Sequence, residues 1–415
     1  MKKSAKIVCG IAAVCLSVSF VGCKGGGTGE AIKLTIWVSE SDKPLAVRIA
    51  QEFEKANPDK TYAFDIDVQG ENELATRLLN DVETGADVFA YPNDQIGKLM
   101  NGDALTRIAG DRLETLKAEN SADAIKSATA IVNGVEGVYG MPYTDNSFFL
   151  YYDKSVFSEQ DVQTMDGILA KCSAGKKFAF PMTDGWYTTS FFFGKGLGYE
   201  VEYDQALAET KISCDFGSAV GEEVVQAMWE LVKDGRVKAD SNDSKLTAGF
   251  HDGSIVAGVS GIWNRKSIEE SLKENFAVAK LPTYTLNKGK DTQEQVQLVA
   301  FTGYKLIGVN NYSKAKADAL AFAQFYTNKE NQILRFQQRG VLPTNLQARK
   351  DEAVMSDVCA RAISEQLKYS KIQVNVPSTL WVPMEGLGNA MITGVQSGVF
   401  NVKEQLAACV KGIEK

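Results

Sequence analysis

Histidine is nearly missing from this sequence, in which His251 is the only one among 415 residues. Zinc sites made of clustered histidines and the HExxH motif are therefore excluded, and little room is left for Ser-His or Cys-His catalysis. His251 precedes Asp252, Gly253 and a strand-like segment at 255–257, which predicts a turn from a helix to a strand. We expect this histidine to be dispensable for the activity of the protein.

Motifs for nucleotide binding and covalent catalysis are also missing. The sequence contains no GxxxxGK[ST], no GxSxG and no GxGxxG after a predicted strand. The glycine-rich residues 194–198 lack the spacing of a phosphate loop and predict a turn. The 52 acidic residues leave open a glycosidase-type pair of carboxylates, but no feature selects one pair. We therefore predict no catalytic residue, no metal and no cofactor.

The chain has no excess of positive charge. Its 45 Lys and Arg residues against 52 Asp and Glu residues give a net charge of −7. Such a chain lacks the electrostatic footprint of proteins that bind nucleic acid or an anionic lipid surface. With 44% apolar and 23% charged residues it has the composition of a globular protein, and it is long enough for two domains.

Only one long apolar run is present, and it lies at the N-terminus. Residues 7–20 are uncharged and follow three lysines, but 14 residues are too few to span a bilayer comfortably. The run leads into Cys23 and the glycine-rich residues 25–29, an arrangement that resembles a bacterial lipobox. This resemblance predicts a signal peptide at 1–22, acylation of Cys23, and a flexible tether at 23–30. The rest of the chain would be extracytoplasmic and lipid-anchored to the bacterial cell membrane.

No CxxC motif occurs, which excludes a zinc knuckle and a thioredoxin-type site. An exported chain permits disulfides, and four cysteines beyond Cys23 allow three pairings. Four buried thiols are an equally good interpretation. These four residues are Cys172, Cys214, Cys359 and Cys409.

Beyond the tether, the sequence alternates between strand and helix patterns. β-branched or period-two segments predict strands at 33–38, 62–68, 86–90 and 305–309. Four-residue spacing of apolar residues predicts helices near 44–56, 74–82 and 313–326. Strands that alternate with helices are typical of βαβ units, so we expect an α/β fold with mostly parallel sheets.

Three tryptophans occupy turns or element boundaries: Trp186, Trp263 and Trp381. By contrast, Trp229 lies in a helical apolar run, and the pair Tyr151 and Tyr152 lies in an apolar strand, so we assign these three side chains to the core. Aromatic faces beside carboxylates and amides suit a hydroxyl-rich ligand, whose CH face stacks on a ring while polar groups bond its hydroxyls. A single boundary tryptophan is more often a core residue, but three together make a ligand platform an equally good interpretation.

The order of motifs from residue 33 onward resembles the extracellular solute-binding proteins of carbohydrate ABC transporters, of the maltose/maltodextrin-binding type. The matching segments are KLTIW at 33–37, DVFAYPNDQIG at 87–97, GMPYTDN at 140–146, WY at 186–187, GIW at 261–263 and LWVPM at 380–384. The resemblance implies a periplasmic-binding-protein fold with two lobes hinged around a central cleft. Lobe 1 would hold residues 31–146 and 299–356, and lobe 2 would hold residues 147–298 and 357–415.

This resemblance implies that the chain is a monomeric binding protein and no enzyme. It would bind a maltodextrin-like oligosaccharide by hinge closure and deliver it to the permease subunits of an ABC transporter. The alternatives are a protein of the same fold for another oligosaccharide or a non-sugar solute, and an extracellular glycan-processing enzyme.

The resemblance also implies the ligand-binding residues. Stacking aromatics would be Trp263, Trp186, Tyr187, Tyr91 and Trp381, and polar contacts would come from Asp94, Asn146, Asp184 and Glu40. Many family members carry a glutamate at the position of Asn146, and some carry an arginine at that of Gln95. These two departures leave the exact sugar open.

Overall fold

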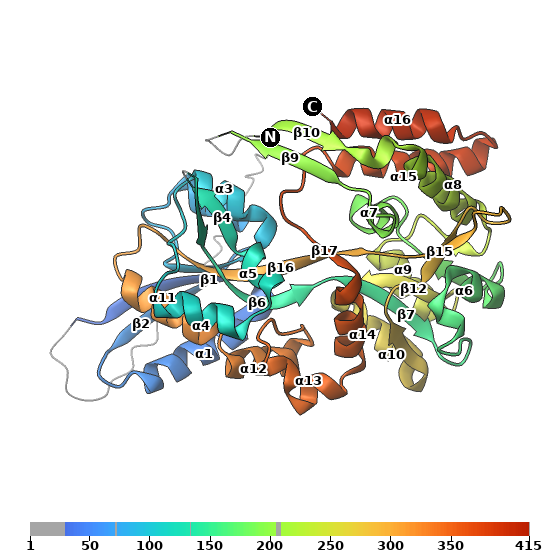
Figure 1. Cartoon of the computed structure of the whole chain (residues 1–415). Coiled ribbons are helices and arrows are strands. Elements are labelled where there is room, and N and C mark those ends of the chain that lie inside the picture. Colours follow the sequence, from blue (N-terminus) through green and yellow to red (C-terminus); the bar gives the residue numbers. More distant parts are fainter. Residues whose placement is uncertain (1–29, 71–72, 133, 205–208, 415) are drawn as a thin grey trace, which may run out of the picture.

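The computed structural model describes residues 30–70, 73–132, 134–204 and 209–414, and it has two lobes, each built on its own β-sheet (Figure 1). The signal peptide predicted at 1–22, Cys23 and nearly all of the tether lie outside the described residues. We call the lobe around the six-stranded sheet lobe 1 and the lobe around the five-stranded sheet lobe 2. Among the described residues, no helix is both long and apolar enough to cross a membrane.

The sheet of lobe 1 has the strand order β17-β16-β3-β1-β2, with β6 paired to β16 as well. β1 runs parallel to β2 and β3, whereas β16 runs antiparallel to β3 and β6. The strands are β1 (Ile32–Val38), β2 (Tyr62–Val68), β3 (Val88–Pro92), β6 (Met141–Asn146), β16 (Ala300–Val309) and β17 (Ser370–Ile372).

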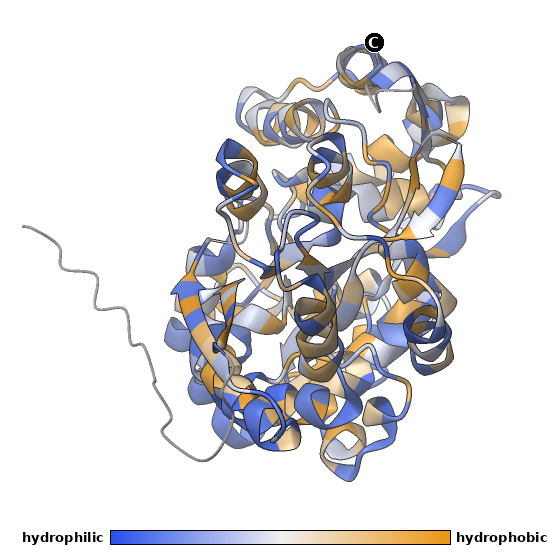
Figure 2. Ribbon diagram, turned by 90° about the vertical axis from the view of Figure 1, so that its left-hand side faces the viewer, coloured by the Kyte–Doolittle hydropathy of each residue, from blue (hydrophilic) through white to orange (hydrophobic). Residues whose placement is uncertain are grey.

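Helix α1 (Lys43–Ala56) shows how the sequence builds lobe 1. Pro44 occupies the first turn, where its missing N–H costs nothing, and Leu45, Ile49 and Phe53 form the face buried against the sheet. Helices with the same mixture of hydrophilic and hydrophobic residues surround both sheets (Figure 2). The other lobe 1 helices are α2 (Leu74–Asn80), α3 (Ile96–Asn101), α4 (Asp111–Glu119), α5 (Ala122–Ser127) and α11 (Lys316–Tyr326).

The sheet of lobe 2 has the order β11-β8-β12-β7-β13. β7 runs antiparallel to both of its neighbours, while β8 runs parallel to β11 and β12. The strands are β7 (Phe148–Asp153), β8 (Lys177–Ala179), β11 (Val237–Lys238), β12 (Ile255–Gly261) and β13 (Phe276–Ala279). The helices around them are α6 (Met165–Lys171), α7 (Gly185–Gly194), α8 (Ala219–Lys233), α9 (Asp243–Asp252), α10 (Arg265–Leu272), α14 (Val358–Gln366), α15 (Trp381–Ser397) and α16 (Val402–Ile413).

The expected α/β fold with two lobes is confirmed. Both sheets are mixed, with three parallel and two antiparallel strand pairings in lobe 1 and two of each in lobe 2. The antiparallel strands β7 and β16 are the ones that the chain enters as it passes from one lobe to the other (Figure 1). A strand that enters directly from a neighbouring sheet needs no crossover helix, so it is not constrained to run parallel. The βαβ pattern therefore holds only where strand and helix alternate within one lobe.

The chain passes between the lobes at several segments, which include Ser147 between β6 and β7, the start of β16, and residues 373–380 between β17 and α15. At the first two connections the Ser147 hydroxyl donates to the carbonyl of Phe301 at 2.9 Å, and both residues are buried. Residues 329–356 include α12 (Lys329–Arg339) and α13 (Glu352–Ser356) and also contact both lobes. Phe336 belongs to the same buried cluster as Phe149 of β7, and Arg339 pairs with Asp42 of lobe 1. The residue boundaries given above for each lobe stay a prediction.

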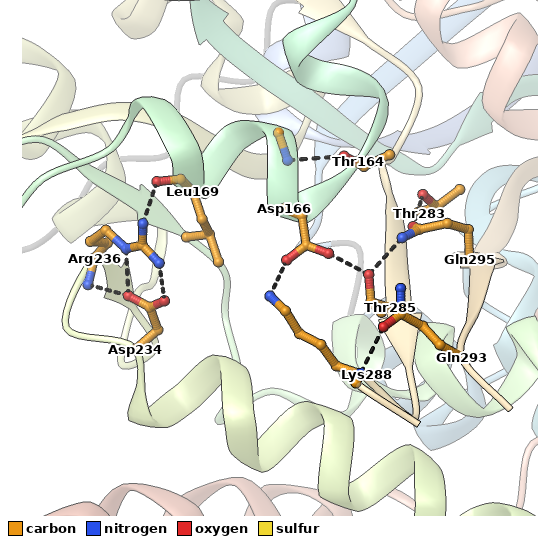
Figure 3. Close-up of polar contacts among 12 residues, drawn as sticks. Thr164, Asp166, Leu169, Asp234, Arg236, Thr283, Thr285, Lys288, Gln293 and Gln295 are labelled. Atoms are coloured by element: carbon orange, nitrogen blue, oxygen red, sulfur yellow. Dashed lines mark hydrogen bonds and ion pairs between the residues drawn. The ribbon is translucent and has the colours of Figure 1, made fainter. Parts of the chain in front are cut away.

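Two hairpins complete lobe 2: β9 (Tyr199–Tyr203) with β10 (Glu209–Cys214), and β14 (Thr283–Leu286) with β15 (Glu294–Gln297). Asp166 of α6 fixes the second hairpin, because it accepts hydrogen bonds from Thr285 and from Lys288, the latter at 2.5 Å (Figure 3). A third hairpin, β4 (Thr129–Val132) with β5 (Val135–Val138), belongs to lobe 1.

The core assignments made from the sequence are confirmed. Tyr151 and Tyr152 are buried in β7, and Trp229 is buried in α8, where its ring stacks on Phe400 with centroids 4.7 Å apart. His251 lies in the last turn of α9, which Gly253 ends with a positive φ of 77° just before β12, as expected. The four cysteines beyond Cys23 are buried free thiols.

Candidate functional site

A cavity of about 600 Å³ lies where the two lobes meet. Lobe 1 contributes Asp94, which follows β3, and the crossover contributes Gln373. Lobe 2 contributes the rest of the lining, which is Pro181, Thr183, Asp184, Gly185, Trp186, Tyr187, Ser241, Asn242, Asp243, Val259, Trp381 and Glu385.

The start of α7 places Trp186 and Tyr187 in the cavity wall. Asp184 is the N-cap of this helix, and its side chain accepts from the backbone N–H of Trp186 at 2.9 Å. Phe148 packs against the rings of both Trp186 and Tyr187, with centroid distances of 4.7 Å. We call the Trp186 ring and its neighbours in this wall the tryptophan platform. Trp186 is half-buried and lines the cavity, so part of its surface is available to a ligand.

Trp381 is the first residue of α15 and lies against the same wall. A Cβ at Gly185 would come within 2.8 Å of Met384 and 3.4 Å of the Trp381 ring, so only glycine allows the start of α7 to approach α15 this closely. The edge of Trp381 packs on Phe301, with centroids 5.9 Å apart. This contact joins the ring to the strand that enters lobe 1.

Trp263 lies in the turn after β12 and exposes 45% of its surface, unusually much for a tryptophan. Its indole N–H donates to Asp243 Oδ2 at 3.0 Å, and Asn264 Nδ2 donates to the other carboxylate oxygen at 2.5 Å. The ring folds back over Gly261, where an added Cβ would lie 1.9 Å from it. Trp263 and Trp186 form a tilted pair with centroids 5.9 Å apart, so Trp263 lies beside the cavity although it is not among the lining residues.

Four carboxylates approach the cavity, and none of its described lining residues is Lys or Arg. Loss of hydration raises the pKa of Asp94, although two backbone hydrogen bonds oppose the shift. Loss of hydration also raises the pKa of Asp184, and the nearby charges of Glu385 and Asp243 raise it further. Burial raises the pKa of Tyr187 well above its ordinary value, so its hydroxyl stays protonated.

Besides Trp263, the structure places three residues implied by the resemblance outside the cavity lining. Tyr91 is 1% exposed in the core of lobe 1, where its hydroxyl donates to the carbonyl of Tyr139, so its ring offers no face to a ligand. Asn146 is half-buried at the end of β6, and its carbonyl accepts from Thr302. Glu40 is exposed in the turn before α1. The cavity lining thus holds five of the nine residues: Trp186, Tyr187, Trp381, Asp94 and Asp184.

The sequence prediction missed Asp243, Gln373 and Glu385. Asp243 follows Asn242, whose side chain caps α9 by accepting from the N–H of Lys245, and an Asn-Asp pair before a helical segment was the available signal. Gln373 and Glu385 carried no local signal, because only the crossover between the lobes brings them to the cavity. Within the described residues, no group of His, Cys, Asp or Glu could hold a metal ion.

The two-lobed α/β fold, with an aromatic and polar cavity between the lobes, defines a solute-binding protein. Residues 48–362 match the family described as bacterial extracellular solute-binding protein, and the chain belongs to this family. The family expected from the sequence motifs is therefore confirmed.

Two curated relatives are similar over most of their length. A galactooligosaccharide-binding protein of Bacillus subtilis is 25% identical over 99% of this chain and 97% of its own. A maltooligosaccharide ABC transporter solute-binding lipoprotein of Streptococcus pneumoniae is 24% identical over 87% of this chain and 84% of its own.

Solved structures are similar as well. A maltodextrin-binding protein of L. casei BL23 without ligand has a TM-score of 0.77 and 26% identity, covering 93% of this chain and 99% of that one. A cyclo/maltodextrin-binding protein in complex with maltotetraose has a TM-score of 0.76 and 22% identity, covering 94% and 98%. The second of these supports the fold alone.

Proposed function

We propose that the protein binds a neutral oligosaccharide of the maltodextrin type in the interlobe cavity and delivers it to the permease of an ABC transporter. The observation that carries this proposal is the group of three indoles at the cavity: Trp186 and Trp381 line it, and Trp263 pairs with Trp186 beside it. Indole rings cover the apolar CH faces of pyranoses, and the surrounding carboxylates and amides accept and donate hydrogen bonds to hydroxyls.

The charge of the cavity argues against anionic ligands. Asp94, Asp184, Asp243 and Glu385 have no Lys or Arg beside them in the described lining, so a phosphate or a uronate would meet like charges. Neutral sugars avoid this repulsion and use the carboxylates as strong acceptors. The names of the relatives agree, since they include maltooligosaccharide-binding and maltodextrin-binding proteins.

A galacto-oligosaccharide is the second candidate. It is favoured by the relative that aligns with 99% of this chain, which is named a galactooligosaccharide-binding protein. The cavity chemistry suits both ligands, because galactose and glucose units present the same kinds of CH faces and hydroxyls.

Calorimetric titration of the purified protein tests the proposal. The panel is maltotriose, a galacto-oligosaccharide, xylotriose, cellotriose and spermidine, the last because carboxylates with aromatic rings also suit an organic cation. We expect saturable binding of maltotriose at one site. Binding of spermidine without any sugar would contradict the proposal, and binding of the galacto-oligosaccharide alone would select the second candidate.

The proposed activity leaves the ligand unchanged. In the family the ligand is captured by closing of the lobes, and no bond is broken. Prolonged incubation with maltodextrins should therefore return them intact in chromatographic product analysis. Appearance of shortened sugars would instead identify two of the cavity carboxylates as a catalytic pair.

The membrane anchor belongs to the same proposal. Acylated Cys23 would hold a monomer at the outer face of the bacterial cell membrane, with residues 24–30 as the tether to lobe 1. Residues 1–22, which precede Cys23, would be removed as a signal peptide. The name of the pneumococcal relative, a solute-binding lipoprotein, supports this arrangement.

A further inference from the structure

Gln373 occupies an unusual place, because it lies both in the cavity lining and in the crossover between the lobes. Its main chain is attached to lobe 1. Its N–H donates to the carbonyl of Thr302 at 2.9 Å, and its carbonyl accepts from Asn93 Nδ2 at 2.7 Å. Asn93 is itself 3% exposed and accepts from the N–H of Tyr304 at 2.8 Å, so this attachment is rigid.

The side chain of Gln373 reaches in the other direction. Its Oε1 accepts from the indole N–H of Trp186 at 3.0 Å. An indole nitrogen only donates, which fixes the oxygen of the amide as its partner. One residue of the crossover is thus bonded to lobe 1 by its main chain and to the tryptophan platform of lobe 2 by its side chain.

We infer that Gln373 is a positioning residue that couples the orientation of Trp186 to the angle between the lobes. This inference rests on the proposed binding of a sugar in the cavity. Hydrogen bonds weaken steeply with distance and angle, so the bond to Trp186 forms only over a narrow range of lobe positions. A ligand that stacks on Trp186 in this orientation then also favours that lobe position, which links binding to closure.

Packing alone does not supply this link. Phe148 and Tyr187 hold the Trp186 ring from within lobe 2, with centroid distances of 4.7 and 5.1 Å. These contacts move with the ring when lobe 2 rotates. Of the ring contacts and hydrogen bonds that the Trp186 side chain makes with described residues, the bond to Gln373 is the one that reaches the crossover.

A double-mutant cycle tests the inference. Gln373→Met removes the acceptor at nearly constant volume, and Trp186→Phe removes the donor but keeps an aromatic ring. Each single variant should bind maltotriose about five- to tenfold more weakly than the wild type, and the double variant should bind no more weakly than the weaker single variant. Gln226→Met, an exposed position on α8, is the matched control and should leave the affinity unchanged.

Two further readouts separate positioning from a merely structural role. Gln373→Glu keeps an acceptor and should restore the affinity to within about twofold of the wild type. Gln373→Met should also shift the tryptophan emission of the ligand-free protein, and the shift should vanish in the Trp186→Phe background. The inference would be overturned if the affinity losses of the two single variants multiplied in the double variant. An unchanged tryptophan emission of Gln373→Met would overturn it as well. Failure of the wild type to bind any sugar would instead reject the proposed function, and the emission experiment would still test the contact.

Discussion

At the scale of single residues, the site depends on tryptophans that the fold holds open towards solvent. Trp263 is 45% exposed and Trp229 is 8% exposed, although both belong to lobe 2. The difference is the local backbone: Gly261 lets one ring fold over the turn after β12, whereas the other ring projects from the middle of α8. Variants of Trp263 and Trp229 can therefore test ligand binding and folding stability separately.

We expect Trp263→Ala to weaken oligosaccharide binding more than tenfold, which corresponds to a loss of about 2 kcal/mol. The free energy of unfolding should change by less than about 1 kcal/mol, because the side chain is largely exposed. Titration calorimetry and denaturant unfolding measure the two effects. Trp229→Ala is the control and should lose about 3–5 kcal/mol of stability through a core cavity. If Trp263→Ala binds the oligosaccharide as tightly as the wild type does, the Trp263 indole does not stack on the ligand.

The cavity carboxylates predict how binding depends on pH. Asp94 and Asp184 have a pKa above the ordinary value, chiefly because they lose hydration, so they take up protons at a higher pH than a free aspartate. A protonated carboxyl is a weaker acceptor, so the affinity should fall as the pH is lowered, beginning above about pH 4, and should level off towards neutral pH.

Calorimetric titrations between about pH 4 and pH 8 measure this profile. Asp184→Asn, which keeps a good N-cap for α7, should flatten it. An affinity of the wild type that rises on acidification would contradict the assigned role of the carboxylates.

At the residue scale, the sequence was sufficient to predict a site residue where a local sequence pattern agrees with the position of that residue in the fold. Trp186 and Trp381 occupy helix starts and Trp263 a turn, and turn signals in the sequence mark all three. Tyr91 was placed wrongly at the site, because a tyrosine at the end of a buried strand can point to either face and the motif does not tell which. Gln373 could not be found, since its position depends on a crossover between distant strands.

At the scale of elements, the regular βαβ parts of lobe 1 were predicted within a few residues. The strands at 62–68 and the helix near 44–56 have clear periodicity and Pro or Asn at their ends. The three hairpins and the antiparallel direction of β7 and β16 were not predicted. Short polar strands have weak patterns, and strand direction is decided by the path between lobes, which local sequence does not encode.

Helix α12 is attached to the start of α1 by a buried cluster of charged and aromatic side chains. Arg335 is 1% exposed and lies between the rings of Tyr143 and Tyr326, with its guanidinium carbon 4.5 and 4.6 Å from their centroids. Asp42, just before α1, is its carboxylate partner at 3.7 Å and also pairs with Arg339 at 2.5 Å. This buried cluster joins the start of α1 to α12.

We expect Asp42→Asn to lower the free energy of unfolding by about 3–5 kcal/mol, because it leaves the buried charge of Arg335 without its carboxylate. Asp240→Asn is the matched control. Asp240 pairs with Lys245 at 2.8 Å in the exposed part of lobe 2, and its loss should cost less than about 1 kcal/mol. Denaturant unfolding monitored by fluorescence compares the two variants, and equal small losses would show that the buried cluster does not stabilise the fold.

At the scale of the whole molecule, the proposed lipid anchor at Cys23 would determine where the protein works. Replacing Cys23 by Ala removes the thiol that would carry the lipid, so the variant should move from the membrane fraction to the medium or the soluble fraction. Cell fractionation and immunoblotting in a bacterial host measure the distribution. Cys172→Ala, at a buried thiol of lobe 2, is the control and should stay with the membrane. A Cys23→Ala protein that also stays membrane-bound would refute the lipid anchor.

The central claim concerns the whole molecule too, because it places an oligosaccharide between two lobes that close on it. The crystal structure of the protein grown with maltotriose tests this claim most directly. We predict sugar rings stacked on Trp186, Trp263 and Trp381, carboxylates of both lobes within hydrogen-bond distance of hydroxyls, and lobes closer together than in the ligand-free protein. A sugar bound outside this cavity, or lobes that stay in place around it, would contradict the account.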